Sequence, residues 1–242
     1  MAINIAINGA NGRMGQEIAK IIESNECLKL VAKFTSLNPI SHDNTAGIDV
    51  IIDFSSEFGL NEVLKYANCK IVSGTTGISP ETFTAMRQYG NEKNGIIWGS
   101  NTSFGVNLLF AMVNKLGSML GSEYDAEVYE RHHRLKKDAP SGTAITIGKK
   151  IAQGRGVEYI QRDYSTQGER KLGEIGFGIE RGGKTVGYHE AAFISDDERI
   201  WIGHEAFDRS IFAKGAVKLA IIAFEQNIKH YNEACDVLAS IL

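Results

Sequence analysis

The sequence predicts an α/β protein with two domains: a doubly wound parallel-sheet domain and a smaller α+β domain with a mixed or antiparallel sheet. Three observations predict this. Short apolar runs alternate with segments of helical periodicity as far as residue 98. The pattern changes near residue 103, where a long apolar helix is expected. After residue 156 come Gly-punctuated runs of β-forming residues.

The first domain contains five predicted strands. The first two, 3–8 and 28–34, are joined by a Gly-rich turn and a helix. Such a unit requires a right-handed crossover and a parallel sheet. Residues 36–47 are rich in Asn, Pro, Ser, Asp and Gly, which is typical of a loop. The other strands are predicted at 50–54, 70–73 and 96–98, and the helices at 13–24, 57–66 and 80–89.

The second domain begins with an amphipathic helix and then becomes richer in strands. Ser141 is a good N-cap residue for one of its helices. The last apolar helix is expected to return to the first domain, so the boundaries are 1–103 with 212–242, and 104–211. The predicted helices are 105–120, 141–152 and 213–226, the first strand is 125–131, and the β runs 173–180, 184–194 and 198–206 look antiparallel.

Composition excludes several classes of protein. Charged residues are 23% of the 242 residues and the formal net charge is -3, which argues against non-specific nucleic-acid or membrane-surface binding. Cys27, Cys69 and Cys235 are odd in number and widely spaced, so we expect neither a disulfide framework nor a Cys-based zinc site. We see no signal-peptide pattern and no membrane span, and a reducing cytoplasm fits these features.

A Gly-rich turn follows the first strand and opens a helix. Its sequence, GANGRMG at 9–15, has the spacing GxxGxxG. Glycines there permit a tight turn and close approach of the backbone to a pyrophosphate, and the helix N-terminus adds partial positive charge. The alternative is a Gly-rich turn with no ligand. The residues expected to contact a dinucleotide are Gly9, Ala10, Asn11, Gly12, Arg13 and Met14.

The end of the second strand favours NADPH over NADH. An Asp or Glu normally binds the ribose 2′-hydroxyl there, but no carboxylate occurs between Glu26 and Asp43. Lys33, Arg13 and the hydroxyls of residues 35–36 are suited to a 2′-phosphate. The sequence therefore predicts NADPH as the preferred cofactor.

Two further loops follow strands of the predicted parallel sheet, at the edge where ligands bind in open α/β sheets. They carry small or hydroxylated residues that leave room for a flat nicotinamide ring, and Phe54 is expected to pack on the cofactor. For each loop, an ordinary turn remains the alternative. The residues concerned are Gly74, Thr75 and Thr76, and Gly99, Ser100, Asn101 and Thr102.

A basic segment near the middle of the chain precedes a Ser-Gly-Thr sequence that starts a helix. It reads ERHHRLKKDAPSGTA over 130–144. The helix N-terminus suits a carboxylate and Lys136 adds a full charge, so an anionic substrate is expected. His132 or Lys136 is expected to donate a proton. A solvated basic loop is one alternative, a His-based zinc site another, and a hydrolase based on Ser141 lacks the GxSxG turn.

These motifs resemble the 4-hydroxy-tetrahydrodipicolinate reductase (dihydrodipicolinate reductase) family over nearly the whole chain. The block at 130–144 is the most specific match. The others are GxxGRMG at 9–15, DFS at 53–55, GTTG at 74–77, NTSFGVN at 101–107, RGG at 181–183, GYH at 187–189 and FAKGA at 212–216.

The resemblance implies a Rossmann-like dinucleotide-binding domain over 1–103 with 212–242, and a substrate-binding and oligomerisation domain over 104–211. It implies NADPH or NADH as cofactor, a dicarboxylic substrate and a homotetramer. His132 and Lys136 match the family's proton-donating residues. The substrate-binding residues implied are His133, Lys136, Ser141, Gly142 and Thr143.

The chain departs from the family pattern at a few places. Tyr188 stands where an acidic residue is expected, the acidic ribose contact is absent, and the 36–47 segment is short. One rival is an acylating semialdehyde dehydrogenase, which needs a Cys nucleophile near the nicotinamide, and none of the three cysteines is well placed. A non-catalytic NADP sensor is the other rival.

Overall fold

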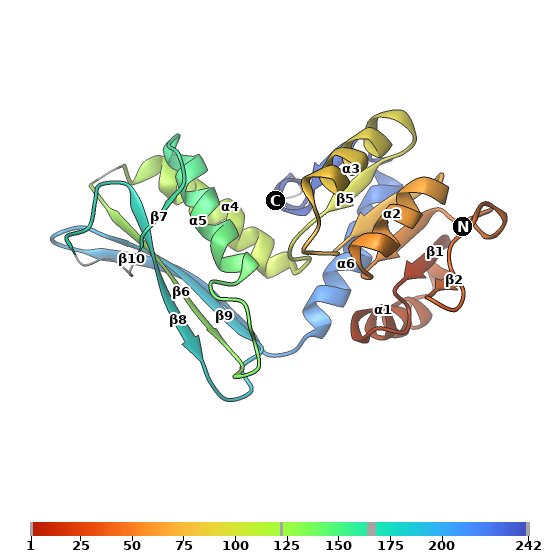
Figure 1. Cartoon of the computed structure of the whole chain (residues 1–242), viewed down its shortest axis with the longest axis horizontal. Coiled ribbons are helices and arrows are strands. Elements are labelled where there is room, and N and C mark those ends of the chain that lie inside the picture. Colours follow the sequence, from red (N-terminus) through yellow and green to blue (C-terminus); the bar gives the residue numbers. More distant parts are fainter. Residues whose placement is uncertain (1, 122, 164–167, 241–242) are drawn as a thin grey trace. The chain divides into compact units, whose positions relative to one another are not determined.

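The computed structural model describes residues 2–121, 123–163 and 168–240. The chain divides into two compact units (Figure 1). Unit 1 comprises Met1–Phe104 and Ser210–Leu242, and unit 2 comprises Gly105–Arg209. No helix among the described residues is long and apolar enough to cross a membrane.

Unit 1 is built on a six-stranded sheet in the order β11-β5-β4-β3-β1-β2, in which every paired strand is parallel. The chain adds β2 on one side of β1 and β3 on the other, so the order reverses at β1. Open α/β sheets bind ligands at such a switch point, beyond the carboxyl ends of the strands. The strands are β1 (Ile3–Asn8), β2 (Leu28–Phe34), β3 (Val50–Asp53), β4 (Lys70–Ser73), β5 (Ile96–Trp98) and β11 (Tyr231–Glu233).

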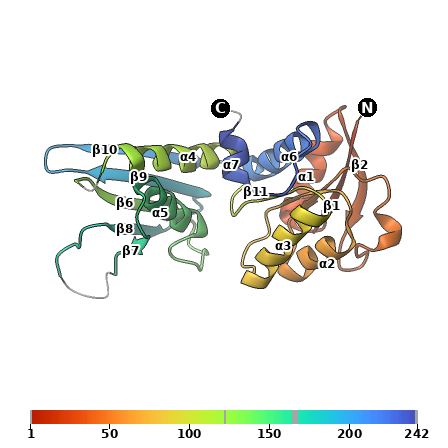
Figure 2. The ribbon, with the colours of Figure 1, turned by 90° about the horizontal axis from the view of Figure 1, so that it is seen from above.

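Helices cover both faces of this sheet (Figure 2), and each face has its own apolar core. Alternate residues of β1 enter different cores, with Ile5 and Ile7 on one face and Ala6 on the other. This division follows from the two-residue period of a strand. The first core includes α1 (Arg13–Glu23), α6 (Ser210–Glu225) and α7 (Ala234–Ala239), and the second includes α2 (Glu57–Tyr66) and α3 (Pro80–Glu92).

Unit 2 is a five-stranded mixed sheet, in the order β10-β9-β6-β8-β7, with helices packed on one face. The helix that contains Gly154 packs closely on the helix that contains Asn114. A Cβ at Gly154 would lie 2.0 Å from the Asn114 carbonyl oxygen, so this close approach requires a glycine. The helices are α4 (Phe104–Met119, whose first residue belongs to unit 1) and α5 (Gly142–Arg155). The strands are β6 (Asp125–His132), β7 (Ile160–Gln161), β8 (Glu174–Arg181), β9 (Gly187–Ile194) and β10 (Arg199–Ala206).

The predicted fold class is confirmed, and the details differ at four places. The late β runs were expected to be antiparallel, which is correct for β9 and β10 but wrong for β8, since β8 pairs with β6 in parallel. The reason is the crossover through α5, which returns the chain in the same direction. The short strands β7 and β11 and a 3₁₀ turn at His42–Asn44, inside the predicted loop, were not predicted.

Candidate functional site

The Gly-rich turn of unit 1 depends on two glycines for its shape. Gly9 has φ +82, and a Cβ there would lie 2.3 Å from the carbonyl oxygen of Phe54. A Cβ at Gly15 would lie 2.4 Å from the Gly9 carbonyl oxygen, so this glycine lets α1 pack directly on the turn. The backbone amides of Gly9 and Ala10 donate to the carbonyl of Phe34, which ties the turn to the end of β2.

Helix α1 begins at this turn without a side-chain cap. Its N-cap residue, Gly12, is exposed and has no side chain to accept from the first helical N–H groups. Uncapped N–H groups at a helix start form an anion-binding site. Arg13, also exposed, is the next residue. The turn therefore fits a pyrophosphate, as the Gly spacing predicts.

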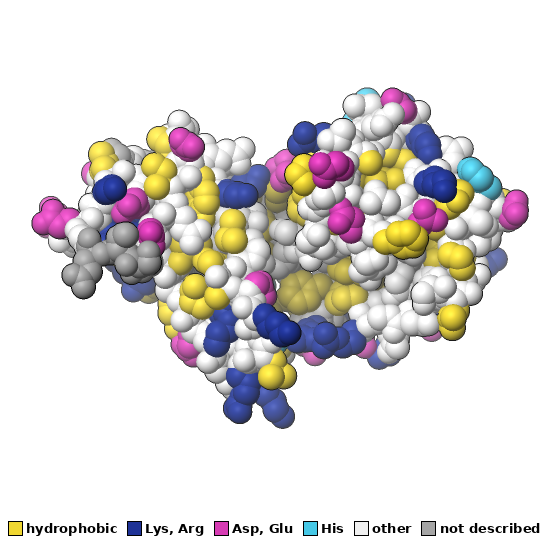
Figure 3. All heavy atoms as spheres, in the orientation of Figure 1, with side chains coloured by type: hydrophobic (Ala, Val, Ile, Leu, Met, Phe, Trp, Pro, Cys, Tyr) yellow, Lys and Arg dark blue, Asp and Glu magenta, His cyan; other side chains and the backbone are white. Residues whose placement is uncertain are grey.

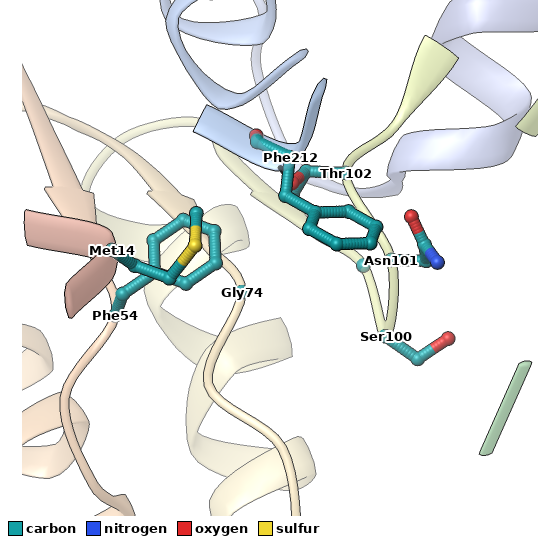
Figure 4. A pocket seen from close by; sticks show the side chains of 8 residues that line it. Met14, Phe54, Gly74, Ser100, Asn101, Thr102 and Phe212 are labelled. Atoms are coloured by element: carbon teal, nitrogen blue, oxygen red, sulfur yellow. Dashed lines mark hydrogen bonds between the residues drawn. The ribbon is translucent and has the colours of Figure 1, made fainter. Parts of the chain in front are cut away.

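A pocket of about 210 Å³ opens beside the turn, within unit 1 (Figure 4). The Phe54 ring and the Met14 side chain lie together on one side of it, and the Phe212 ring points into it from α6. The Thr102 hydroxyl donates to the Phe212 carbonyl at 2.8 Å. The lining residues are Met14, Phe54, Gly74, Gly99, Ser100, Asn101, Thr102 and Phe212.

A buried carboxylate joins the loops around this pocket. Asp53 is fully buried at the end of β3. Its Oδ1 accepts from Asn8 Nδ2 at 2.8 Å and from Ser55 Oγ at 2.5 Å, and its Oδ2 accepts from Ser73 Oγ at 2.8 Å and Thr75 Oγ1 at 2.7 Å. Burial raises the pKa of Asp53, and the four hydrogen bonds oppose that shift. The ends of β1, β3 and β4 are thereby fixed to one another.

The remaining predicted cofactor residues lie outside the pocket lining. The Thr75 hydroxyl donates to Asp53 and accepts from the Ser55 amide, so it serves the protein's own network. Thr76 is exposed. Lys33 is exposed at the end of β2, and its Nζ lies 3.4 Å from Glu23 Oε1. Thus a carboxylate lies near the predicted 2′-phosphate contact, although it comes from α1 and not from the end of β2.

Unit 2 holds a buried cluster of ionisable side chains at the end of β6. His132 is 7% exposed and His189, from β9, is 5% exposed; their ring centroids are 4.9 Å apart. Glu130, two residues before His132 and fully buried, has its Oε2 3.4 Å from His132 Nδ1. Its Oε1 is paired with Arg181 Nη2 at 2.5 Å. Three strands therefore bring these four side chains together.

Both histidines of this cluster are held in the neutral form by their surroundings. Burial lowers the pKa of His132 to about 4; the Glu130 carboxylate acts in the opposite direction, while Lys136 and Arg181 reinforce the effect of burial. Burial also lowers the pKa of His189 to about 3. A buried imidazole with a perturbed pKa in a charged cluster is a candidate acid or base.

The basic loop after His132 exposes Arg134 and Lys137 on unit 2. Lys and Arg side chains gather at the lower end of the left-hand part of the molecule in Figure 3. Lys136 Nζ lies 2.8 Å from Asp138 Oδ2, and His133 lies 3.4 Å from the Arg209 guanidinium. The loop ends at Ser141, whose hydroxyl accepts from the Ala144 amide as the predicted N-cap of α5. A Cβ at Gly142 would meet nothing within 4 Å, which leaves room for a ligand at the helix start.

The cluster also contains a group of possible metal ligands. Glu130, His132 and His189 offer ligand atoms that lie within 4.8 Å of one another. Two observations argue against a cation there. Arg181 already pairs with Glu130, and positive charge on Lys136 and Arg181 acts on both histidines. We therefore keep the expectation that no metal is required.

Sequence reasoning did not single out several residues of these sites. Three of them, Phe212, Arg181 and His189, lie in segments that resemble the family. That resemblance was the signal in the sequence that could have identified them. Asp53 and Glu130 were visible at strand ends, but nothing in the sequence showed how many buried groups converge on each carboxylate.

A parallel α/β unit with an uncapped Gly-rich turn, and a second unit with a buried histidine beside a basic loop, define a dinucleotide-dependent oxidoreductase acting on an anion. The chain matches the family models "Dihydrodipicolinate reductase, N-terminus" over residues 3–102 and "Dihydrodipicolinate reductase, C-terminus" over residues 105–238. It belongs to the dihydrodipicolinate reductase family, whose members are NAD(P)H-dependent oxidoreductases of lysine biosynthesis.

Curated relatives agree with this assignment. The 4-hydroxy-tetrahydrodipicolinate reductase of Wolbachia pipientis wMel is 38% identical over 250 residues, which cover 93% of this chain and 94% of the relative. The enzyme of the same name from Zymomonas mobilis is 38% identical over 244 residues and 95% of each chain. The dipicolinate-bound dihydrodipicolinate reductase from Paenisporosarcina sp. TG-14 shares the fold, with a TM-score of 0.72, 23% identity and coverage of 96% of this chain and 98% of that one.

Proposed function

We propose that this protein carries out its family's reaction with a cofactor held by unit 1 and an acid site in unit 2. It reduces 4-hydroxy-tetrahydrodipicolinate, or its dehydrated form, to tetrahydrodipicolinate in lysine biosynthesis. The observation that carries the proposal is the buried His132 beside a basic loop and a helix N-terminus with room for a ligand at Gly142. We place the reaction in the cytoplasm, as the sequence predicts.

Unit 1 fits a dinucleotide at two places. The uncapped start of α1 at Gly12 would bind the pyrophosphate through backbone N–H groups. The pocket lined by Phe54, Gly74 and the 99–102 loop would hold the nicotinamide. When bound, the reduced nicotinamide supplies a hydride. Met14 and Phe54 offer an apolar surface for the ring, and the hydrogen bonds from Ser73 and Thr75 to Asp53 hold the start of the Gly74 loop in place.

Unit 2 would hold the substrate and supply the proton. The Lys136 charge, the His133 ring and the start of α5 at Ser141–Thr143, through the backbone N–H groups of Gly142 and Thr143, would bind the two carboxylates. A bound dianion favours the protonated form of His132, opposing the burial that lowers its pKa. His132 and Lys136 are thus the two groups that could protonate the atom beside the one that receives hydride.

Replacing the two proposed donors tests the assignment. We expect His132→Gln and Lys136→Ala each to lower kcat by about 100-fold or more, since a general acid contributes that much. The matched control is Lys137→Ala, the exposed neighbour of Lys136, which should leave kcat unchanged. Wild-type kcat in both His132→Gln and Lys136→Ala would rule out these roles.

The preference for NADPH is part of the proposal. Arg13 and Lys33 are exposed at the ends of the turn and of β2, where they could pair with a 2′-phosphate. Glu23 competes for Lys33, so Arg13 is the stronger candidate. The ratio of kcat/KM for NADPH to that for NADH should fall on Arg13→Ala. A clear preference of the wild type for NADH would refute this part.

We also propose that the open face of the unit 2 sheet forms the contacts of a homotetramer. This face, opposite the helices, carries aromatic and Arg side chains typical of interfaces. Trp201 is 61% exposed there, and the Tyr129 and Tyr188 rings lie 6.1 Å apart beside the Arg131 guanidinium. Multi-angle light scattering should give four times the mass of 26.5 kDa; a monomer would contradict the proposal.

A further inference from the structure

Glu130 is the centre of the buried cluster in unit 2. It lies on the same face of β6 as His132, because side chains two residues apart in a strand point the same way. One carboxylate oxygen, Oε1, accepts from the Ser141 amide at 3.1 Å and from Arg181 at 2.5 Å. Glu130 thus connects the start of α5, the end of β8 and the histidine on β6.

The other oxygen faces two histidines. Oε2 lies 3.4 Å from His132 Nδ1 and 3.7 Å from His189 Nε2. Among the described residues, neither Oε2 nor His132 Nδ1 has a hydrogen-bond partner that meets full geometric criteria, and both atoms are buried. Leaving such groups unmatched is costly. Because an ionised carboxylate only accepts, the imidazole nitrogen that faces it must carry the proton.

We propose that Glu130 is a positioning residue that fixes the orientation and tautomer of His132, with the proton on Nδ1 and the lone pair on Nε2. The other nitrogen, Nε2, lies on the side of Gly187, where a Cβ would come within 3.2 Å of it. That small residue leaves Nε2 room to exchange a proton. The catalytic importance of this arrangement rests on the proposed function, whereas the tautomer itself does not.

The charged and titratable groups around the cluster come from several elements. They are Arg181 on β8, Lys136 and Asp138 on the basic loop, His189 on β9 and His204 on β10. Arg181 neutralises the Oε1 side of Glu130, which leaves Oε2 for the histidine. The arrangement parallels the carboxylate that orients a histidine in hydrolase triads.

The direct test is nitrogen-15 NMR of the histidine rings in the whole protein at about pH 7.5, where neutral imidazole tautomers are distinguishable. His132→Gln identifies the His132 signals by their loss. The expected result is a protonated Nδ1 and an unprotonated Nε2. A proton on Nε2 would overturn the inference, and so would ring signals that shift when EDTA is added, since these would indicate a metal.

Variants then separate positioning from a purely structural role. Glu130→Gln should mix the tautomers, shift the pH profile of kcat/KM and lower kcat at least about 10-fold, with KM changed less than about threefold. Glu174→Gln is the matched control, since Glu174 lies on β8, as Arg181 does, but pairs with Arg162, outside the cluster, and this variant should change none of these. An unmoved tautomer and pH profile in Glu130→Gln would overturn the inference.

The inference can still be tested if the variant fails to fold, and its failure can be told apart from failure of the proposed function. If Glu130→Gln does not fold, the wild-type tautomer still decides, and Glu130→Asp keeps the negative charge while shortening the side chain that reaches His132. If the wild type shows the expected tautomer but reduces no substrate, the proposed function fails and the positioning of His132 stands.

Discussion

Replacing Asp53 with Ala should destabilise unit 1 and loosen its pocket. Asp53 accepts four hydrogen bonds, from Asn8, Ser55, Ser73 and Thr75. At about 1 kcal/mol for each net hydrogen bond, their loss should lower the free energy of unfolding by about 4 kcal/mol. With a slope near 2.5 kcal/mol per M, the urea midpoint should fall by about 1.6 M.

Two further variants make this test specific. Asp53→Asn keeps one acceptor oxygen, and the Ser73 and Thr75 hydroxyls can turn to accept from its amide, so the loss should be about 1 kcal/mol. Asp49→Ala removes a carboxylate that accepts from the Asn4 amide at 2.8 Å and should also cost about 1 kcal/mol. Asp53→Ala should in addition raise the Kd for the cofactor. If its urea midpoint equals that of Asp49→Ala, the network does not hold these loops.

Three other predictions follow from the structure. A Cβ at Gly74 would lie 2.3 Å from the Phe54 ring, so Gly74→Val should displace that ring and raise the KM for the cofactor at least about 10-fold; an unchanged KM would place the nicotinamide elsewhere. Trp201→Glu should dissociate the oligomer in light scattering, and an intact tetramer would exclude this face. Since the folded-state pKa values of His132 and His189, about 4 and 3, lie below the unfolded value of 6.5, the unfolded chain binds more protons below pH 6.5. The stability that these two neutral histidines contribute should therefore be complete above pH 6.5 and should decline as the pH falls toward 4. A urea midpoint that stays constant over this range would contradict the lowered pKa values.

Local features of the sequence predicted much of the fold. Ser141 caps α5 as expected, because an N-cap is a local interaction between a side chain and nearby amides. The strand β11 was missed because it is three residues long and pairs with β5, more than 130 residues earlier. Its identity depends on a partner strand that the local pattern does not reveal.

The candidate sites were predictable where a motif is continuous and unpredictable where distant segments converge. The Gly-rich turn and the basic loop are single segments, so their residues could be named from the sequence. Phe212 reaches the pocket proposed for the nicotinamide only because α6 belongs to unit 1. Glu130 and Arg181 meet across two strands, and no local pattern indicated that the Glu130 carboxylate would be fully buried.

The most direct test of the central claim is a coupled assay of the wild-type protein, in which 4-hydroxy-tetrahydrodipicolinate is generated enzymatically and the loss of NADPH absorbance is followed. The account predicts loss of NADPH that depends on the substrate and on the protein, and that pyridine-2,6-dicarboxylate, a planar mimic of the substrate, inhibits competitively. If neither NADPH nor NADH is consumed while substrate is present, the protein is not the reductase that its fold and sites define.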